Sequence, residues 1–184
     1  MTSYWILAPP VDAKWCAIYD NPEFDDFGLP MEGEPIGAGY ESVDFRMTKE
    51  VKGKLVPDVI MNVLGYLMVS DRAKELIEAN ATAPIEYLPF RMIDHKKGVA
   101  AERCWIVNVI GTVDCGDAAN IEGLPYPNRE GVYFQGSRLP ILADRVPSSR
   151  NIFRTAQYPP HVFIRDDLKQ LMENAKLSAI YVAP

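Results

Sequence analysis

The sequence predicts an α+β protein built on a mixed or antiparallel β-sheet with a few short helices. Three observations lead to this class: a strand-helix-strand pattern that occurs twice, several further apolar runs of strand length, and a long acidic stretch rich in glycine and proline. Of the 184 residues, 48% are hydrophobic and 24% charged, so the composition is globular. We expect a single domain over residues 1–184, in which residues 1–54 supply N-terminal strands and the acidic loop.

The strand-helix-strand pattern is repeated at a fixed distance along the chain. Residues 67–89, LMVSDRAKELIEANATAPIEYLP, return in altered form as residues 162–184, VFIRDDLKQLMENAKLSAIYVAP, at a constant offset of 95 positions. The identical pairs are Asp71 and Asp166, Lys74 and Lys169, Leu76 and Leu171, Glu78 and Glu173, Ile85 and Ile180, and Pro89 and Pro184. Patterns of this length are common, so duplication and convergence both account for the likeness.

Each copy contains an amphipathic helix that we expect to pack on a sheet. The stripe at i, i+3, i+4 and i+7 consists of Ala73, Leu76, Ile77 and Asn80 in the first copy and of Leu168, Leu171, Met172 and Ala175 in the second. Ser70 has a hydroxyl that can cap the first helix. Arg165 at the equivalent position has no acceptor, so we predict that Asp166 caps the second helix.

The segments before the first copy predict two strands and a helix. Residues 4–7 and 15–19 have the composition of short strands, and prolines separate them. Residues 56–64, VPDVIMNVL, predict a short helix, because Pro57 and Asp58 precede an apolar run that ends near Gly65.

The segments between the copies predict mainly strands and loops. Residues 85–93 and 102–110 predict an antiparallel hairpin around the turn DHKKG. Pro89 cannot donate to a ladder, so its strand is expected to lie at an edge or to carry a bulge there. The run CWIV at 104–107 is apolar on both faces and predicts a central strand. Residues 111–138 predict loops, and residues 139–142 and 151–156 predict the last strands before the second copy.

The negative charge of the chain is concentrated in one segment, which we call the acidic segment. It runs from residue 20 to residue 44 without lysine or arginine and contains eight acids: Asp20, Glu23, Asp25, Asp26, Glu32, Glu34, Glu41 and Asp44. Because the whole chain carries a net charge of −6, the remaining residues carry +2. Such a segment repels nucleic acid and attracts a basic protein surface. A solvated loop that keeps the protein soluble is the alternative interpretation.

Residues typical of catalytic sites are few. The chain has two histidines, His95 and His161, and three cysteines without C-x-x-C spacing, which are Cys16, Cys104 and Cys115. We expect the cysteines to be reduced and at least partly buried. A His95–Cys104 pair is conceivable, but an active thiol needs an exposed, electropositive setting and a cysteine in a central strand is expected in the core.

Metal and cofactor sites are not indicated either. Asp114 and Asp117 lack the alternating oxygen ligands and the closing glutamate of a calcium loop, so a turn or cap is the favoured interpretation. The sequence contains no phosphate-binding loop, nucleophile elbow or zinc-protease motif. We therefore expect no cofactor and no enzymatic activity.

The sequence also argues against a membrane or nucleic acid partner. No run approaches the ~20 apolar residues of a membrane helix, and the first residues lack a signal-peptide pattern, so we expect a soluble cytoplasmic protein. The most basic stretch, with Arg145, Arg150, Arg154 and Arg165, is interrupted by acids and lacks an aromatic stacking motif.

The order of features from residue 55 to residue 184 resembles a bacterial family known as immunity protein family eleven. The resembling blocks are LMVSDRAKEL, IEYLPFRMIDHKKG, CWIVNVIGTVDCGD with Asn108, Asp114 and Asp117, and RNIFRTAQYPPHVFIRDDLKQLMENAKLSAIYV. Residues 1–50 match only in an early YWIL-type strand. The resemblance implies a non-enzymatic cytoplasmic protein, encoded beside a polymorphic toxin, that binds this cognate toxin, often a nuclease, and blocks it in the producing cell.

The acidic segment is the candidate partner-binding site, because a nuclease presents a basic substrate channel. We expect its electrostatic face to consist of Asp20, Glu23, Asp25, Asp26, Glu32 and Glu34, with Phe24, Phe27 and Tyr40 as aromatic anchors. Two alternatives belong to other classes: a small hydrolase or transferase that uses a histidine with Cys104 or an aspartate, and a structural adaptor that pairs through sheet edges such as the strand of Pro89.

Overall fold

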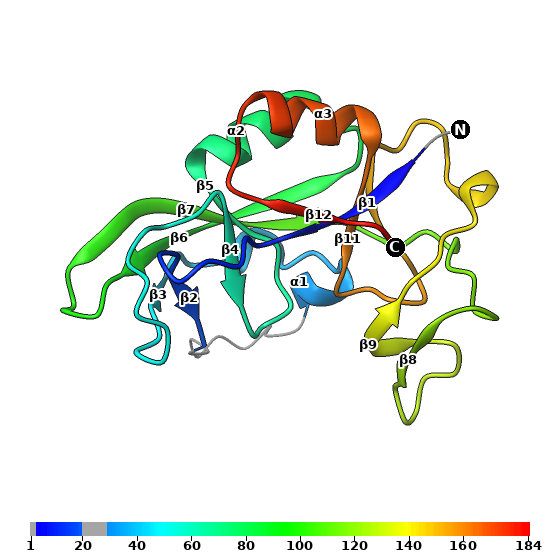
Figure 1. Ribbon diagram of the computed structural model, residues 1–184, viewed down its shortest axis with the longest axis horizontal. Coiled ribbons are helices and arrows are strands. Elements are labelled where there is room, and N and C mark those ends of the chain that lie inside the picture. The colour runs from blue at the N-terminus through cyan, green and yellow to red at the C-terminus, as the bar shows by residue number, and fades with distance from the viewer. Residues whose placement is uncertain (1–2, 20–28) are drawn as a thin grey trace.

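The computed structural model describes residues 3–19 and 29–184 of the chain. The described residues form two main β-sheets and a small two-stranded sheet, and helices α2 (Asp71–Asn80) and α3 (Asp166–Asn174) lie beside each other over the main sheets (Figure 1). A third, one-turn helix is α1 (Leu29–Glu32), and 3-10 turns span Gly37–Gly39 and Ala143–Arg145. The α+β class with few short helices is confirmed.

Both main sheets contain predominantly antiparallel neighbours. The six-stranded sheet has the order β2-β4-β5-β7-β6-β3, formed by Ala17–Ile18, Val59–Asn62, Met68–Ser70, Val99–Val109, Ile85–Ile93 and Val43–Arg46. The four-stranded sheet has the order β10-β11-β1-β12, formed by Ile152–Arg154, Val162–Arg165, Tyr4–Ala8 and Ile180–Val182. The small sheet pairs β8 (Glu122–Pro125) with β9 (Tyr133–Arg138). The parallel pairs are β2 with β4 and β3 with β6, so the six-stranded sheet is mixed.

The two strand-helix-strand units predicted from the repeat are both present. The first is β5-α2-β6 and the second is β11-α3-β12, and the helices begin at Asp71 and Asp166, which are 95 positions apart. The correspondence extends to facing pairs in the neighbouring strands, although the offset shortens from 95 positions before the helix (Val69 and Ile164) to 94 after it (Tyr87 and Tyr181). The equivalent pairs are Val69 with Trp105 and Ile164 with Trp5 and, on the other side of the central strand, Val107 with Tyr87 and Leu7 with Tyr181.

We therefore divide the sheets into two equivalent halves. The first half consists of β4, β5, α2, β6 and β7, and the second consists of β10, β11, α3, β12 and β1. The central strand of the first half, β7, follows β6 along the chain, whereas its counterpart β1 comes from the N-terminal segment. The second half is thus assembled from two distant parts of the chain.

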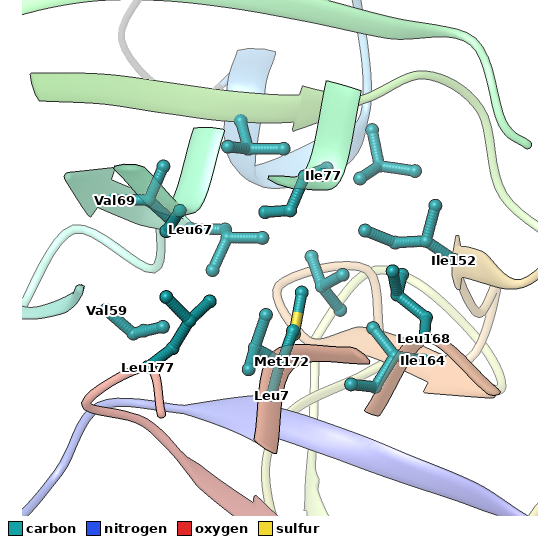
Figure 2. Packing of buried hydrophobic residues seen from close by; sticks show 14 residues of the cluster. Leu7, Val59, Leu67, Val69, Ile77, Ile152, Ile164, Leu168, Met172 and Leu177 are labelled. Atoms are coloured by element: carbon teal, nitrogen blue, oxygen red, sulfur yellow. The ribbon is translucent and has the colours of Figure 1, made fainter. Parts of the chain in front are cut away.

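The halves share one hydrophobic core, shown in Figure 2. The cluster contains residues in equivalent positions of both halves, including Leu67 with Val162, Val69 with Ile164, Ala73 with Leu168, and Ile77 with Met172. Of the two predicted helix stripes, Ala73, Ile77, Leu168 and Met172 are buried, while Leu171 is 42% exposed. Burial is therefore confined to the part of each stripe that faces the shared core.

The two helices begin differently despite their equivalent positions. Ser70 accepts a hydrogen bond from the Ala73 backbone N–H at 3.2 Å, as predicted for an N-cap. The predicted cap by Asp166 is wrong: the N-cap position is Arg165, which makes no side-chain cap, and Asp166 is the first helical residue. The Asp166 carboxylate instead accepts from the Trp5 indole N–H at 3.1 Å and therefore ties the helix to β1.

The helix predicted over residues 56–64 is also wrong, because this segment forms strand β4. β-Branched Val59 and Ile60 are buried and pair with β5, and a strand accommodates such residues better than a helix does. Asp58, expected at a helix start, uses its carboxylate to bind the backbone and hydroxyl of Ser178. The contact of Asp58 with Ser178 is therefore formed in place of the helix start that Pro57 and Asp58 predict.

The hairpin predicted over residues 85–93 and 102–110 is confirmed. Strands β6 and β7 pair antiparallel, with a register shift between Phe90 and Met92, just after Pro89. Strand β6 is not an open edge over its whole length, since β3 pairs with it from Phe90 onward.

The prediction of loops over residues 111–138 is partly wrong, because this region contains the small β8-β9 sheet in addition to loops. The strand predicted at 139–142 is reduced to one bridge at Ile141.

Candidate functional site

Three of the nine predicted binding residues lie in the described part of the chain. Glu32 ends helix α1, Glu34 follows it, and Tyr40 ends the 3-10 turn. The other predicted residues, Asp20, Glu23, Phe24, Asp25, Asp26 and Phe27, lie outside the described residues. The site can therefore be built from residues 29–41, which we call the strap.

The strap is fixed to the six-stranded sheet through its own main chain. On β7, the Asn108 side chain is fully buried and donates from Nδ2 to the backbone carbonyl of Glu34 at 2.7 Å. On β6, the Glu86 carboxylate accepts the backbone N–H groups of Ile36 at 3.0 Å and of Gly37 at 2.7 Å. These contacts fix the path of the backbone without using the side chains of the strap.

A buried arginine from the other sheet holds the start of the strap. Arg154 on β10 is 0% exposed and donates to the carbonyl of Pro30 at 2.8 Å and to that of Pro159 at 2.6 Å. Burial lowers the pKa of Arg154 to about 10, and the negative charge of Glu32 opposes this shift. The guanidinium therefore remains protonated at neutral pH and places a positive charge beneath the strap.

Gly33 allows the strap to approach the sheet closely. Its φ is +76°, and its carbonyl accepts from the Gly111 backbone N–H at 2.8 Å. A Cβ at this position would lie 2.9 Å from the carbonyl oxygen of Val109. Both the backbone angle and the available space therefore require glycine here.

The acids of the described part differ in their pairing. Glu32 forms an ion pair with Arg129 at 2.9 Å, and Asp44 binds Arg91 through two hydrogen bonds of 2.7 and 2.9 Å. Although the acidic segment contains no lysine or arginine, arginines from other parts of the chain therefore neutralise these two acids. Among the described residues, neither Glu34 nor Glu41 forms a salt bridge, and both are exposed. They are the acids in the described part of the acidic segment that are available to a partner.

Tyr40 lies against the sheet and supports the strap. Its hydroxyl donates to the carbonyl of Pro89 at 3.0 Å, and its ring is partly buried against the cluster that includes Phe45 and Phe90. Burial raises the pKa of Tyr40 to about 12. The residue is therefore only partly accessible in its predicted role as an aromatic anchor.

The residues considered for catalysis are placed unfavourably for it. Cys104 is fully buried, and burial raises the pKa of its thiol to about 12. Burial, together with the charge of Arg154, lowers the pKa of His161 to about 4. One ring nitrogen of His95 lies 2.8 Å from the carbonyl oxygen of Thr48. All three cysteines are buried and free, as expected.

Asp114 and Asp117 serve the local chain path. Asp117 accepts from the Asn120 amide at 2.7 Å within a turn, and Asp114 accepts from the Gln157 amide. Over residues 3–19 and 29–184, no group of three or more histidine, cysteine or acidic side chains could hold a metal ion. In the same part of the chain, no helix is long and apolar enough to cross a membrane.

The sequence did not reveal the residues that hold the strap. Glu86, Asn108 and Arg154 lie within runs that read as strands, and their contacts with the strap come from residues 49 to 124 positions away. A polar residue in an otherwise apolar strand was the available signal, since such a group must find a partner when buried.

Fold and site together define an α+β protein that presents a backbone-anchored, partly acidic segment at its surface. The chain belongs to the immunity protein family (Imm11), whose model matches residues 18–182. The match includes the acidic segment and therefore extends further toward the N-terminus than the resemblance seen in the sequence. A comparison with curated proteins finds no match. Membership in this family identifies the protein as an immunity protein, a class that acts by neutralising a toxin.

Proposed function

We propose that the protein binds one cognate toxin and neutralises it by direct contact in the cytoplasm of the cell that produces both. Family membership over residues 18–182 supports neutralisation as the activity. The surroundings of Cys104, His95 and His161 favour binding over hydrolase or transferase chemistry, because none of them provides an activated nucleophile beside a base.

The observation that carries the binding site is the way the strap is held. Asn108, Glu86 and Arg154 contact its main-chain atoms, so its exposed carboxylates are held near the surface without being neutralised by these contacts. Glu34 and Glu41 would then meet a basic surface of the toxin, and Asp20, Glu23, Asp25 and Asp26 would extend this face.

A nuclease is the class of toxin that best fits such a face. An enzyme that acts on nucleic acid needs a basic channel for the phosphates of its substrate. Carboxylates that enter this channel would occupy the place of phosphates and block the substrate. Association would then be fast at low ionic strength and would slow down as salt screens the charges.

The first experiment tests neutralisation itself. The toxin encoded beside this gene is expressed alone and together with the wild-type protein, and growth is measured. Rescue of growth by the wild-type protein, together with a stable complex of the purified proteins, is the expected result. Toxicity that persists at equal expression levels, without complex formation, would contradict the proposed function.

The second experiment tests the electrostatic face. Replacing Glu34→Lys and Glu41→Lys together should slow association about tenfold at low salt and much less at high salt. The matched control replaces Glu75→Lys and Asp144→Lys, two exposed acids outside the strap, with the same change in net charge. Equal association rates for both double variants would show that the strap is not the electrostatic face.

A further inference from the structure

At three of the four outer edges of the two halves, a parallel segment of the chain lies along the edge. In the first half, β2 pairs parallel with β4, and β3 pairs parallel with β6. In the second half, Thr155, which directly follows the edge strand β10, forms a single parallel bridge with Val113. Each of these edges therefore receives a segment that runs in the same direction as the strand.

The fourth edge, the outer side of β12, has no such cover in the described part of the chain. Among residues 3–19 and 29–184, only β1 pairs with β12. In Figure 1, β12 runs alongside β1 below the two helices. Strand edges with unpaired backbone groups are sites at which another chain can add a strand.

The register of the ladder shows which backbone groups face this edge. The Asp166 N–H donates to the Ser3 carbonyl, and bonded and non-bonded pairs alternate along antiparallel strands. Ile6 and Ala8 therefore direct their backbone groups toward β12, opposite Val182 and Ile180. It follows that Tyr181 directs its N–H and carbonyl away from β1, to the outer edge, and that Ala183 does the same.

The side chains at this edge are apolar and accessible. Ile180 is 37% exposed and Val182 is 45% exposed, and Val182 lies opposite Ile6 of the cluster around Phe153 and Phe163. At the edge of the first half, β3 places Phe45 against Phe90 with ring centroids 4.9 Å apart. A segment added to β12 can extend the neighbouring cluster in the same manner.

We propose that the outer edge of β12 is a docking edge for an extended segment of the toxin. The segment would run parallel to β12, would bind the backbone groups of Tyr181 and Ala183, and would carry apolar side chains at alternate positions, one of them packing beside Ile180 and Val182. This proposal rests on the proposed function, because its occupant is the toxin. A second copy of the chain fits less well, since a twofold axis would pair two β12 strands antiparallel, while all three covered edges carry parallel segments.

Backbone hydrogen exchange, followed by NMR on the free protein and on the saturated toxin complex, tests this edge. The Tyr181 and Ala183 amides should exchange quickly in the free protein and at least tenfold more slowly in the complex. The Ile180 and Val182 amides, which face β1, serve as the internal reference and should change little. Slow exchange of Tyr181 in the free protein, or protection that depends on concentration without toxin, would show that the chain covers its own edge and would overturn the proposal.

A variant at Ala183 isolates the contribution of one backbone donor. Ala183→Pro removes an N–H that faces away from β1, and Ala183→Ser is the matched control that retains it. We expect the proline variant to bind the toxin about three- to tenfold more weakly than the serine variant, with an unchanged midpoint of thermal unfolding. If the proline and serine variants bind the toxin with equal affinity, and the toxin does not protect the Tyr181 amide from exchange although the wild-type protein binds it, the docking edge is overturned and the proposed function stands. Failure of the wild-type protein to bind the toxin would overturn both.

Discussion

The two halves of the molecule join through equivalent contacts built from different chemistry. Asp58 precedes β4 and Asn151 precedes β10, and each reaches into the other half. The Asp58 carboxylate accepts from the Ser178 N–H at 2.8 Å and from its hydroxyl at 2.9 Å. The Asn151 side-chain oxygen accepts from the N–H and the hydroxyl of Thr82, both at 3.0 Å. In return, the backbone N–H groups of Asp58 and Asn151 donate to these hydroxyls.

The difference lies in how each contact satisfies the end of a helix. The amide of Asn151 also donates to the carbonyl of Asn80, the last residue of α2, at 2.9 Å. A carboxylate has no N–H, and in the other contact Arg72 lies 3.5 Å from Asp58 and donates to the carbonyl of Ala175 at the end of α3. In one contact a single amide makes all of these bonds, and in the other contact a carboxylate and a guanidinium make them together. In both contacts, a side chain from one half caps the C-terminal end of the helix in the other half.

The largest effect should follow from breaking the amide contact. Asn151→Ala removes the acceptor for Thr82 and the donor for Asn80, and Asn151 is only 4% exposed. We expect the free energy of unfolding to fall by about 2 kcal/mol, measured by urea denaturation, with one transition because both halves share a core. Asn120→Ala, in an exposed turn, is the control and should cost less than about 0.5 kcal/mol. A loss at position 151 no larger than this control would contradict the role of the contact.

A smaller and pH-dependent effect should follow from changing the acidic contact. Burial by itself would raise the pKa of Asp58, but hydrogen bonds from Ser178 and Ser70 and the charge of Arg72 outweigh burial and hold the pKa below its usual value of 3.8. Because the folded-state pKa is the lower one, the carboxylate contributes stability above pH 3.8 that is lost as the pH falls through the folded-state pKa.

Asp58→Asn converts the acidic contact into a copy of the amide contact and removes this titration. The variant should therefore lose less stability than the wild type when urea unfolding is repeated from neutral pH to below pH 3.8. Asp144→Asn, an exposed acid outside both contacts, is the matched control. The same pH dependence in the wild type and in Asp58→Asn would show that this carboxylate does not link stability to pH.

The sequence predicted the two units well because their signal is local. Helix α2 and its Ser70 cap depend on residues that are close along the chain, and so does the hairpin of β6 and β7. The equivalence of Trp5 and Trp105 was not visible, because the two tryptophans are 100 positions apart and the repeat offset is 95. A search at one fixed offset cannot detect a central strand that follows the unit in one half and precedes it in the other.

The candidate site was less predictable than the fold for a related reason. Its acidic composition is visible in the sequence, but the pairing of Glu32 with Arg129 and of Asp44 with Arg91 depends on how distant segments meet. The helix predicted over residues 56–64 is wrong on the same grounds, since Asp58 binds a residue 120 positions away instead of starting a helix, and the segment forms strand β4. Charges and caps are local features of a sequence, whereas their partners are set by the tertiary fold.

The smallest effect should come from two lysines that occupy equivalent aromatic settings. Lys74 lies 5.0 Å from the ring centroid of Trp105, and Lys169 lies 4.6 Å from that of Trp5. Each lysine also forms an ion pair four residues along its helix, with Glu78 at 2.6 Å and Glu173 at 2.8 Å. Lys74→Met and Lys169→Met keep most of the side-chain packing and remove the charge, so each should lower the free energy of unfolding by about 0.5–1 kcal/mol. Lys→Arg at either position retains the charge and should cost less. Because the settings are equivalent, unequal losses for the two methionine variants in urea denaturation would show that the likeness of the halves stops at the backbone and the core.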